Sequence, residues 1–286
     1  MKKILICGAG SYIGGSFETY MRSFADQYSI DTLDMQADNW REHDFSAYGT
    51  VFFVAGIAHQ KETKENAHLY YAVNRDLAFE CARLAKQSGV SQFIFLSSMS
   101  VYGIERGVIT KDTKPAPVSN YGKSKLEAEE LLATLADESF KICVVRPPMV
   151  YGNGCKGNFV TVVKLVRKLP FFPKVANRRS MIYIDNLSLF IKICIDRELD
   201  GLYMPQNREY MNTTEMARTI AEGLDKKCRM SAFLGLGVKI LTPFVGMAKK
   251  AFGTLVYENC EELDYEYSTV DIKESVLRSV ADKENI

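Results

Sequence analysis

The stretch "KKILICGAGSYIGG", residues 2–15, decides the fold that we expect for this chain. A short apolar run ends in a turn that contains Gly8, Gly10, Gly14 and Gly15, and a helical pattern follows. A strand-to-helix turn without side chains lets a pyrophosphate approach backbone N–H groups at the positive end of the helix. The stretch therefore predicts a strand, a phosphate-binding turn and a helix, in that order.

Strand-like and helix-like segments alternate along the first two thirds of the chain. Segments of helical pattern cover residues 12–26, 67–88 and 122–137. The apolar runs typical of buried strands are "KKILIC" (2–7), "YSIDTLD" (28–34), "TVFFVAG" (50–56), "SQFIFLSS" (91–98) and "FKICVVRP" (140–147). This alternation predicts an α/β fold, a doubly wound parallel sheet of the Rossmann type with right-handed crossovers.

The regular alternation ends after "RPPMVYGNG" (146–154), where prolines and glycines break the pattern. We therefore expect a dinucleotide-binding domain over residues 1–155 and a smaller, mainly substrate-binding lobe over residues 156–286. Residues 178–198 carry a further strand and helix pattern, and we expect this segment to return to the main sheet.

Composition excludes several classes of function. Lys and Arg number 36 against 35 Asp and Glu, so the net charge of +1 offers no electrostatic reason to expect nucleic acid as a partner. The seven cysteines are odd in number and form no Cys-x-x-Cys pair, which argues against a disulfide framework or a metal site. These cysteines predict a reduced protein in the cytoplasm.

The most apolar tract runs from residue 232 to 257 and is interrupted by Lys239, Pro243, Lys249 and Lys250. A membrane-spanning helix needs about 20 consecutive apolar residues, so no span is expected here. A buried helix of the smaller lobe is the favoured interpretation, and an amphipathic helix on a membrane surface is the alternative.

Asp34 closes the second predicted strand, 20 residues after Gly14. A carboxylate at this point of a dinucleotide-binding fold accepts hydrogen bonds from both ribose hydroxyls and repels a 2′-phosphate. The sequence therefore predicts NAD rather than NADP as the cofactor.

A second motif, "SNYGKSK" at residues 119–125, places Lys125 four residues after Tyr121. On a helix these side chains lie one turn apart on the same face. A nearby ammonium favours the phenolate form of a tyrosine, which makes Tyr121 a candidate acid and base. The spacing alone is weak evidence, because it also arises by chance.

Together these segments resemble the extended short-chain dehydrogenase/reductase family. Residues 8–14 are similar to its glycine fingerprint, with Ser11 at the middle glycine position, and "HDF" (43–45), "VAGIAH" (54–59) and "AVNRDLA" (72–78) resemble later family segments. The resemblance implies that the following residues contact NAD: Gly8, Gly10, Ser11, Tyr12, Ile13, Gly14, Asp34, Asp44, Phe45, Ala55, Gly56, Asn74, Tyr121 and Lys125.

The segment "LSSMSVYG" (96–103) supplies the remaining catalytic residue that the resemblance implies. Ser98 takes the place of the family's catalytic hydroxyl beside Tyr121 and Lys125. Ser100 follows two residues later and faces the same way if the strand pattern persists, so it is expected to contact substrate. Met99 and Ser100 stand where sugar dehydratases of the family carry Asp and Glu, which disfavours a 4,6-dehydratase.

In the second lobe, residues 146–159 and 177–186 resemble segments of the nucleotide-sugar epimerases within this family. By resemblance, Asn158 and Arg179 hold the nucleoside diphosphate, and arginine suits this role because its planar fork binds phosphate oxygens bidentately. Arg178 is a rival for the same role. Met149 replaces an asparagine that contacts the sugar in 4-epimerases, so the sugar pocket is expected to differ.

The resemblance implies an NAD-dependent 4-epimerase of a UDP-hexose or UDP-N-acetylhexosamine, serving polysaccharide biosynthesis. A reductase that converts a UDP-4-keto-6-deoxy-sugar with consumption of NADH is the nearest alternative. A non-catalytic NAD-sensing protein is a third and is disfavoured, because all three catalytic residues are present. The family also implies a homodimer, formed through the helices over residues 67–88 and 122–137.

Overall fold

The computed structural model describes residues 1–58, 62–241, 252–258 and 262–281. The chain divides into two compact units. The first unit consists of residues 1–103, 114–147 and 187–205, and the second of residues 104–113, 148–186 and 206–286.

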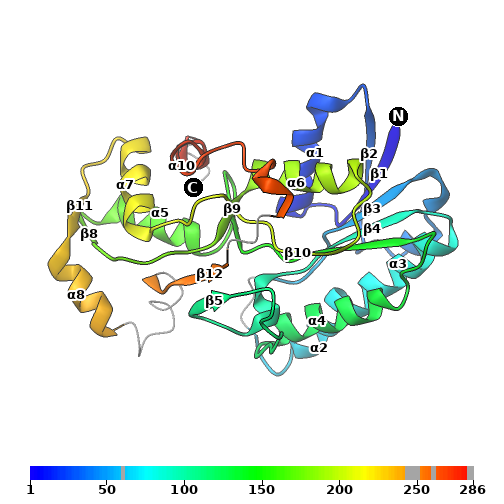
Figure 1. Ribbon diagram of the computed structural model, residues 1–286, viewed down its shortest axis with the longest axis horizontal. Helices are drawn as coiled ribbons and strands as arrows, with labels where there is room; N and C mark the ends of the chain where they lie inside the picture. Colours follow the sequence, from blue (N-terminus) through cyan, green and yellow to red (C-terminus); the bar gives the residue numbers. More distant parts are fainter. Residues whose placement is uncertain (59–61, 242–251, 259–261, 282–286) are drawn as a thin grey trace. The chain divides into compact units, whose positions relative to one another are not determined.

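A six-stranded parallel sheet forms the centre of the first unit (Figure 1). Its strand order is β10-β6-β4-β3-β1-β2, so chain order reverses between β1 and β3. The strands are β1 (Lys2–Cys7), β2 (Tyr28–Leu33), β3 (Thr50–Phe53), β4 (Gln92–Leu96), β6 (Lys141–Val145) and β10 (Gly201–Tyr203). The doubly wound parallel sheet predicted from the sequence is confirmed, and its topological switch point lies between β1 and β3.

Helices cover both faces of this sheet. In Figure 1, α1 lies on one side of it and α3 and α4 on the other. Successive strand residues point to opposite faces: Phe52 packs against Phe17 of α1, with ring centroids 5.3 Å apart, whereas Phe53 packs against Phe95, 6.2 Å away. The helices with residues in this unit are α1 (Tyr12–Met21), α2 (Ala67–Tyr71), α3 (Leu77–Gln87), α4 (Asn120–Ala133) and α6 (Ile184–Asp196).

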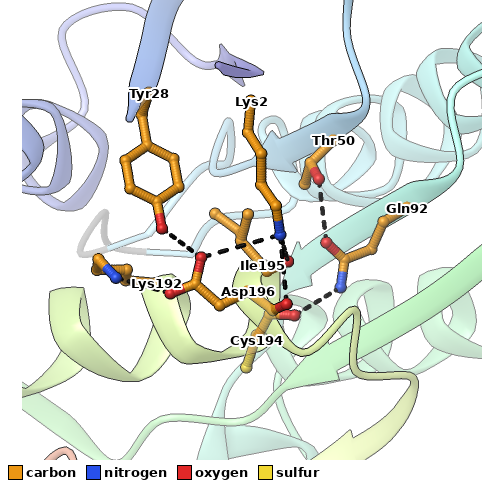
Figure 2. A network of polar contacts seen from close by, with 8 residues as sticks. All are labelled: Lys2, Tyr28, Thr50, Gln92, Lys192, Cys194, Ile195 and Asp196. Carbon is orange, nitrogen blue, oxygen red and sulfur yellow. Dashed lines mark hydrogen bonds and ion pairs between the residues drawn. The ribbon is translucent and has the colours of Figure 1, made fainter. Parts of the chain in front are cut away.

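The end of α6 is bound to the amino ends of the strands through a network of polar contacts (Figure 2). Lys2 donates to the carbonyl oxygens of Ile195 and Asp196 at 3.1 and 3.2 Å, and Tyr28 donates to the Asp196 carboxylate. A cation at a helix C-terminus satisfies unpaired carbonyls and complements the helix dipole. These contacts attach residues 187–205 to the first unit.

Gln92, a fully buried residue of β4, completes this network. Its side-chain amide donates to the carbonyl oxygens of Cys194 and Leu199, each at 2.9 Å, and its oxygen accepts from Thr50 at 3.1 Å. Replacing Gln92 with leucine is expected to lower the free energy of unfolding by about 2–4 kcal/mol, because the Leu199 carbonyl and the Thr50 hydroxyl lose a buried partner. Urea denaturation measures the loss.

The exposed neighbour Ser91 provides the control, since its hydroxyl also donates to a carbonyl, that of Gly49, at 3.0 Å. Ser91→Ala is expected to change stability by no more than about 0.5 kcal/mol, because water replaces the lost partner. Equal losses in the two variants would contradict the role of Gln92.

The second unit is built from short elements. Three pairs of parallel strands are present among its described residues: β7 with β9, β8 with β11, and β5 with β12. The strands are β5 (Gly107–Ile109), β7 (Met149–Tyr151), β8 (Phe171–Pro173), β9 (Met181–Tyr183), β11 (Arg229–Ser231) and β12 (Leu255–Tyr257). Its helices are α5 (Asn158–Lys168), α7 (Thr213–Gly223), α8 (Ala232–Leu241) and α10 (Ile272–Val280).

The apolar tract predicted to form a buried helix does not do so where it is described. Residues 232–241 form α8, and most of its large apolar side chains are exposed. Burial resumes at β12, whereas residues 242–251 lie outside the described part of the chain. In the described residues, no helix combines the length and hydropathy required to cross a membrane.

Candidate functional site

The glycine turn lies at the carboxyl end of β1, at the topological switch point. Gly8 has φ +135°, and a Cβ there would lie 2.7 Å from the amide nitrogen of Ala55, so only glycine is tolerated. Ser11, the departure from the family fingerprint, is the N-cap of α1, and its hydroxyl accepts from the amide of Gly14 at 3.0 Å. Helix α1 therefore still begins directly after the glycine turn, which is the arrangement that suits a phosphate. Tyr12 and Ile13 are the first two residues of this helix.

Asp34 lies beside this turn. The carbonyl of Leu33, the last residue of β2, accepts from the amides of Gly8 and Ala9 at 3.0 and 3.2 Å. The Asp34 side chain is exposed, and one carboxylate oxygen accepts from the amide of Gln36 at 2.9 Å. A carboxylate with a free oxygen beside a glycine turn suits an adenosine ribose.

Asp44 and Phe45 lie where an adenine contact was expected, and they differ in exposure. The Asp44 carboxylate accepts from the amide and hydroxyl of Ser46 at 2.9 and 2.6 Å, and these hydrogen bonds lower its pKa. The ring of Phe45 is buried in the core of the first unit. Any contact of Phe45 with an adenine would therefore involve its backbone and not its ring.

Asn74 joins the segment after β3 to helix α4. Its side-chain oxygen accepts from the amide of Ile57 at 2.8 Å, while its amide group donates to the Ile57 carbonyl at 3.2 Å and to the Ser124 hydroxyl at 3.1 Å. A Cβ on Gly56 would lie 2.9 Å from the Asn74 oxygen and 3.4 Å from Nζ of Lys125. Asn74 sits in a π-helical turn, a feature often found at functional sites.

Helix α4 has two caps at its first turn. The Ser119 hydroxyl accepts from the amide of Gly122 at 3.1 Å. The Glu62 carboxylate accepts from the amides of Asn120 and Tyr121 at 3.0 and 3.1 Å. A carboxylate at the positive end of a helix dipole is stabilising. Sequence reasoning missed Glu62, because it lies far from α4 along the chain and in no recognised motif.

The Ser98 and Ser100 hydroxyls lie together, although not in the way expected. Strand β4 ends at Leu96, and Ser98 caps a 3₁₀ turn by accepting from the Ser100 amide at 3.1 Å. The strand pattern does not persist, but the turn still brings the Ser98 hydroxyl within 3.2 Å of the Ser100 hydroxyl.

Tyr121 is half-buried on the first turn of α4, and Ser98 hydrogen-bonds its phenol. Loss of water on burial raises the pKa of Tyr121, and the Ser98 hydrogen bond partly offsets this rise. Desolvation is the larger of these two effects. This rise in the pKa of Tyr121 is opposite to the lowered pKa that the spacing of Tyr121 and Lys125 led us to expect.

Lys125 is buried one turn further along α4. Its Nζ donates to the carbonyl of Leu96 at 2.7 Å and lies 4.6 Å from the centroid of the Phe95 ring. Burial lowers the pKa of Lys125 to about 7, and the negative charge of Glu129 opposes this shift. Burial therefore disfavours the charged form of this amine in the cofactor-free protein.

The lowered pKa of Lys125 predicts a pH dependence of stability. An unfolded lysine has a pKa of about 10.4, so between pH 7 and about 10 the unfolded chain binds more protons than the folded chain. The free energy of unfolding of the cofactor-free protein should therefore rise with pH in this window, relative to a Lys125→Met variant. Urea denaturation at several pH values measures the difference, and parallel curves would contradict the lowered pKa.

A buried ion pair supports Lys125 and the end of β4. Arg146 donates from Nε to both oxygens of Glu129 at 3.0 and 3.1 Å, and from Nη1 to the hydroxyl of Tyr102 at 2.8 Å. The Ser97 hydroxyl also donates to Glu129. Sequence reasoning missed this group. Glu129 lies four residues after Lys125, the same helical spacing that separates Tyr121 from Lys125, and this spacing could have indicated it.

In the second unit, Arg179 is 9% exposed and has no carboxylate partner among the residues described. Its Nη1 donates to the carbonyl of Gly253 at 3.0 Å, and its Nε has no hydrogen-bond partner within the described part of the chain. Burial lowers the pKa of Arg179. The rival Arg178 is exposed, 5.6 Å from the Tyr210 ring centroid. Asn158 begins α5, whose first turn contains no acid. A buried guanidinium with a free N–H suits an anionic ligand.

The parallel sheet, with its switch point at a glycine turn, places the chain in the Rossmann-type dinucleotide-binding class. Residues 4–197 match the NAD dependent epimerase/dehydratase family. A UDP-glucose 4-epimerase of Vibrio cholerae is 38% identical over 254 residues, covering 79% of this chain and 76% of that protein. The chain therefore belongs to the NAD dependent epimerase/dehydratase family, whose members are enzymes.

Two further relatives mark the breadth of this similarity. An N-acetyl-alpha-D-glucosaminyl-diphospho-ditrans,octacis-undecaprenol 4-epimerase of Escherichia coli O157:H7 is 25% identical over 247 residues, covering 78% of this chain and 73% of that protein. A crystal structure of dTDP-4-dehydrorhamnose reductase from Bacillus anthracis, in complex with NADP, superimposes with a TM-score of 0.74 at 20% identity. The superposition covers 98% of each chain, and this similarity supports the fold alone.

Proposed function

We propose that this enzyme is a nucleotide-sugar 4-epimerase acting on a UDP-hexose or a UDP-N-acetylhexosamine, with NAD as its cofactor. The observation that carries the proposal is the grouping of Ser98, Tyr121 and Lys125 at the carboxyl end of β4, within the family just described. The relative of higher identity supports epimerisation as the reaction.

The residues have separate roles in the proposed reaction. Tyr121 takes the proton from the C4 hydroxyl of the sugar and later returns it, while Ser98 hydrogen-bonds the same oxygen. Lys125 holds the ribose of the nicotinamide, and the glycine turn and Asp34 hold the pyrophosphate and the adenosine ribose. Bound NAD supplies a reversible hydride acceptor for C4. In the second unit, Asn158 and Arg179 hold the diphosphate of the substrate.

An assay without added cofactor tests the proposal against the reductase alternative. The purified protein is incubated with UDP-glucose or with UDP-N-acetylglucosamine, and the C4 isomers are separated. An epimerase that retains NAD equilibrates the isomers, whereas a 4-reductase leaves both substrates unchanged. Absence of turnover would contradict the epimerase. Oxidation of NADH with a UDP-4-keto-6-deoxy-sugar then separates the reductase from the non-catalytic alternative.

The carrier of the sugar is tested in the same assay. The E. coli relative is named for a sugar diphosphate on undecaprenol, and the exposed apolar helix α8 favours including such a substrate here. Undecaprenyl-diphosphate N-acetylglucosamine in detergent is therefore the third substrate.

The homodimer and the cytoplasmic location expected from the sequence stay predictions.

Arg179 and its neighbour Arg178 provide a matched pair of variants for the diphosphate site. Arg179→Met is expected to weaken the binding of UDP about 10- to 100-fold, because a charge-assisted hydrogen bond to phosphate is lost. Arg178→Met removes an exposed guanidinium and is expected to change the affinity less than about threefold. Calorimetry with UDP measures both. A larger effect of Arg178→Met would assign the role to Arg178.

A further inference from the structure

Helix α8 presents a stripe of large apolar side chains to solvent. Phe233, Leu236 and Ile240 are 83%, 57% and 61% exposed, and their spacing of three and four residues places them on one face. Surface helices of globular proteins normally turn this face towards the core. A contiguous exposed apolar surface marks an interaction site.

The opposite side of α8 is fixed to the second unit. Gly235 packs so closely on the carbonyl of Lys174 that a Cβ would lie 2.0 Å from that oxygen. Phe171 of β8, the strand on which α8 packs, is also exposed, as is Leu169 just before this strand. Figure 1 shows α8 beside β8 and β11 at one end of this unit. The apolar stripe therefore cannot turn inwards without breaking this packing.

The charged residues of the segment that contains α8 are of one sign. The chain as a whole is nearly neutral, with 36 basic against 35 acidic residues. The segment from residue 226 to 257 contains no Asp or Glu, and its basic residues are Lys226, Lys227, Arg229, Lys239, Lys249 and Lys250. Of the described side chains, those of Lys227, Arg229 and Lys174 are exposed.

We propose that α8 docks the enzyme on a bilayer surface that contains anionic lipids. The helix lies in the plane of the membrane, with Phe233, Leu236 and Ile240 at the boundary between headgroups and acyl chains. The exposed side chains of Lys174, Lys227 and Arg229 contact lipid phosphates. At ten residues α8 spans about 15 Å, half of the hydrocarbon thickness, so it lies on the membrane and does not cross it. A second copy of the chain would bring the same positive charge to this face and be repelled.

Vesicle flotation of the full-length protein tests the proposal. Vesicles of phosphatidylcholine mixed with phosphatidylglycerol are compared with vesicles of phosphatidylcholine alone, at low and high salt. The protein is expected to float with the anionic vesicles at low salt and to be released in part by salt. Replacing Phe233, Leu236 and Ile240 together with glutamine should lower the bound fraction about tenfold or more.

A matched control replaces three other exposed apolar residues, Val108, Val118 and Leu202, with glutamine. This variant should float like the natural chain, and circular dichroism with thermal melting checks that both variants fold. The proposal is overturned if the natural chain stays in solution with anionic vesicles at low salt, or if the α8 variant floats equally well. It is also overturned if the α8 changes convert a dimer to a monomer without altering flotation. None of these measurements depends on the proposed 4-epimerase activity.

Discussion

Replacing Tyr121 with phenylalanine is expected to lower the rate of C4 epimer exchange by about 10²- to 10⁴-fold. That is the range contributed by a side chain that transfers a proton in the transition state. The phenol is the group that Ser98 hydrogen-bonds, and no other residue of the group at the end of β4 combines this position with a titratable hydroxyl. The measurement is the rate of UDP-sugar isomerisation, divided by the NAD content of the purified protein so that loss of cofactor does not count as loss of proton transfer.

Tyr71→Phe is the matched control for this substitution. The Tyr71 hydroxyl donates to the side chain of Asn120 at 3.2 Å, so this variant also removes a phenol that contacts the start of α4. It should keep nearly full activity, because Tyr71 has no role in proton transfer. Turnover retained in Tyr121→Phe, or lost equally in both variants, would contradict the assignment of Tyr121.

The second large effect is expected from the buried ion pair between Glu129 and Arg146, whose side chains are 8% and 7% exposed. Arg146→Met should lower the free energy of unfolding by about 3–5 kcal/mol, because it leaves a carboxylate buried without its partner. The double variant Glu129→Gln with Arg146→Met should lose less than the sum of the two single changes, since it removes both charges. Chemical denaturation of the four proteins completes this cycle.

An exposed ion pair provides the comparison. Lys273 and Glu222 lie 3.0 Å apart, with both side chains more than half exposed. Lys273→Met should lower the free energy of unfolding by no more than about 1 kcal/mol.

The buried pair of Glu129 and Arg146 also affects the candidate site. Ser97 donates to Glu129, and the charge of Glu129 opposes the lowering of the Lys125 pKa. Additive losses in the cycle would show that Glu129 and Arg146 do not act as a pair.

The central sheet could be predicted because its strands are buried on both faces and therefore appear as continuous apolar runs. β3 and β4 are buried at every residue, and both runs were recognised. The strand expected within residues 178–198 is present as β9, but it pairs with β7 of the second unit and not with the main sheet. The other strands of the second unit gave no such signal, because they contain only three residues each and pair with partners far along the chain. Helix α8 was predicted to be buried because an apolar pattern does not show whether a partner surface exists.

For the candidate site, the motifs predicted which residues lie together more reliably than how they titrate. The spacing of Tyr121 and Lys125 gives their separation along a helix and carries no information about lost hydration. Burial raises the pKa of Tyr121 and lowers that of Lys125. Glu62 caps α4 from another segment of the chain, and such tertiary contacts leave no local signature.

The alternation of the chain between its two units restricts how such an enzyme can be divided by recombination. The backbone passes from one unit to the other after residues 103, 113, 147, 186 and 205. A gene fragment that stops at residue 155 would encode β6 without its edge partner β10, and Gln92 without the carbonyls of Cys194 and Leu199. Exchange of the whole second unit between related genes therefore requires several simultaneous splice points.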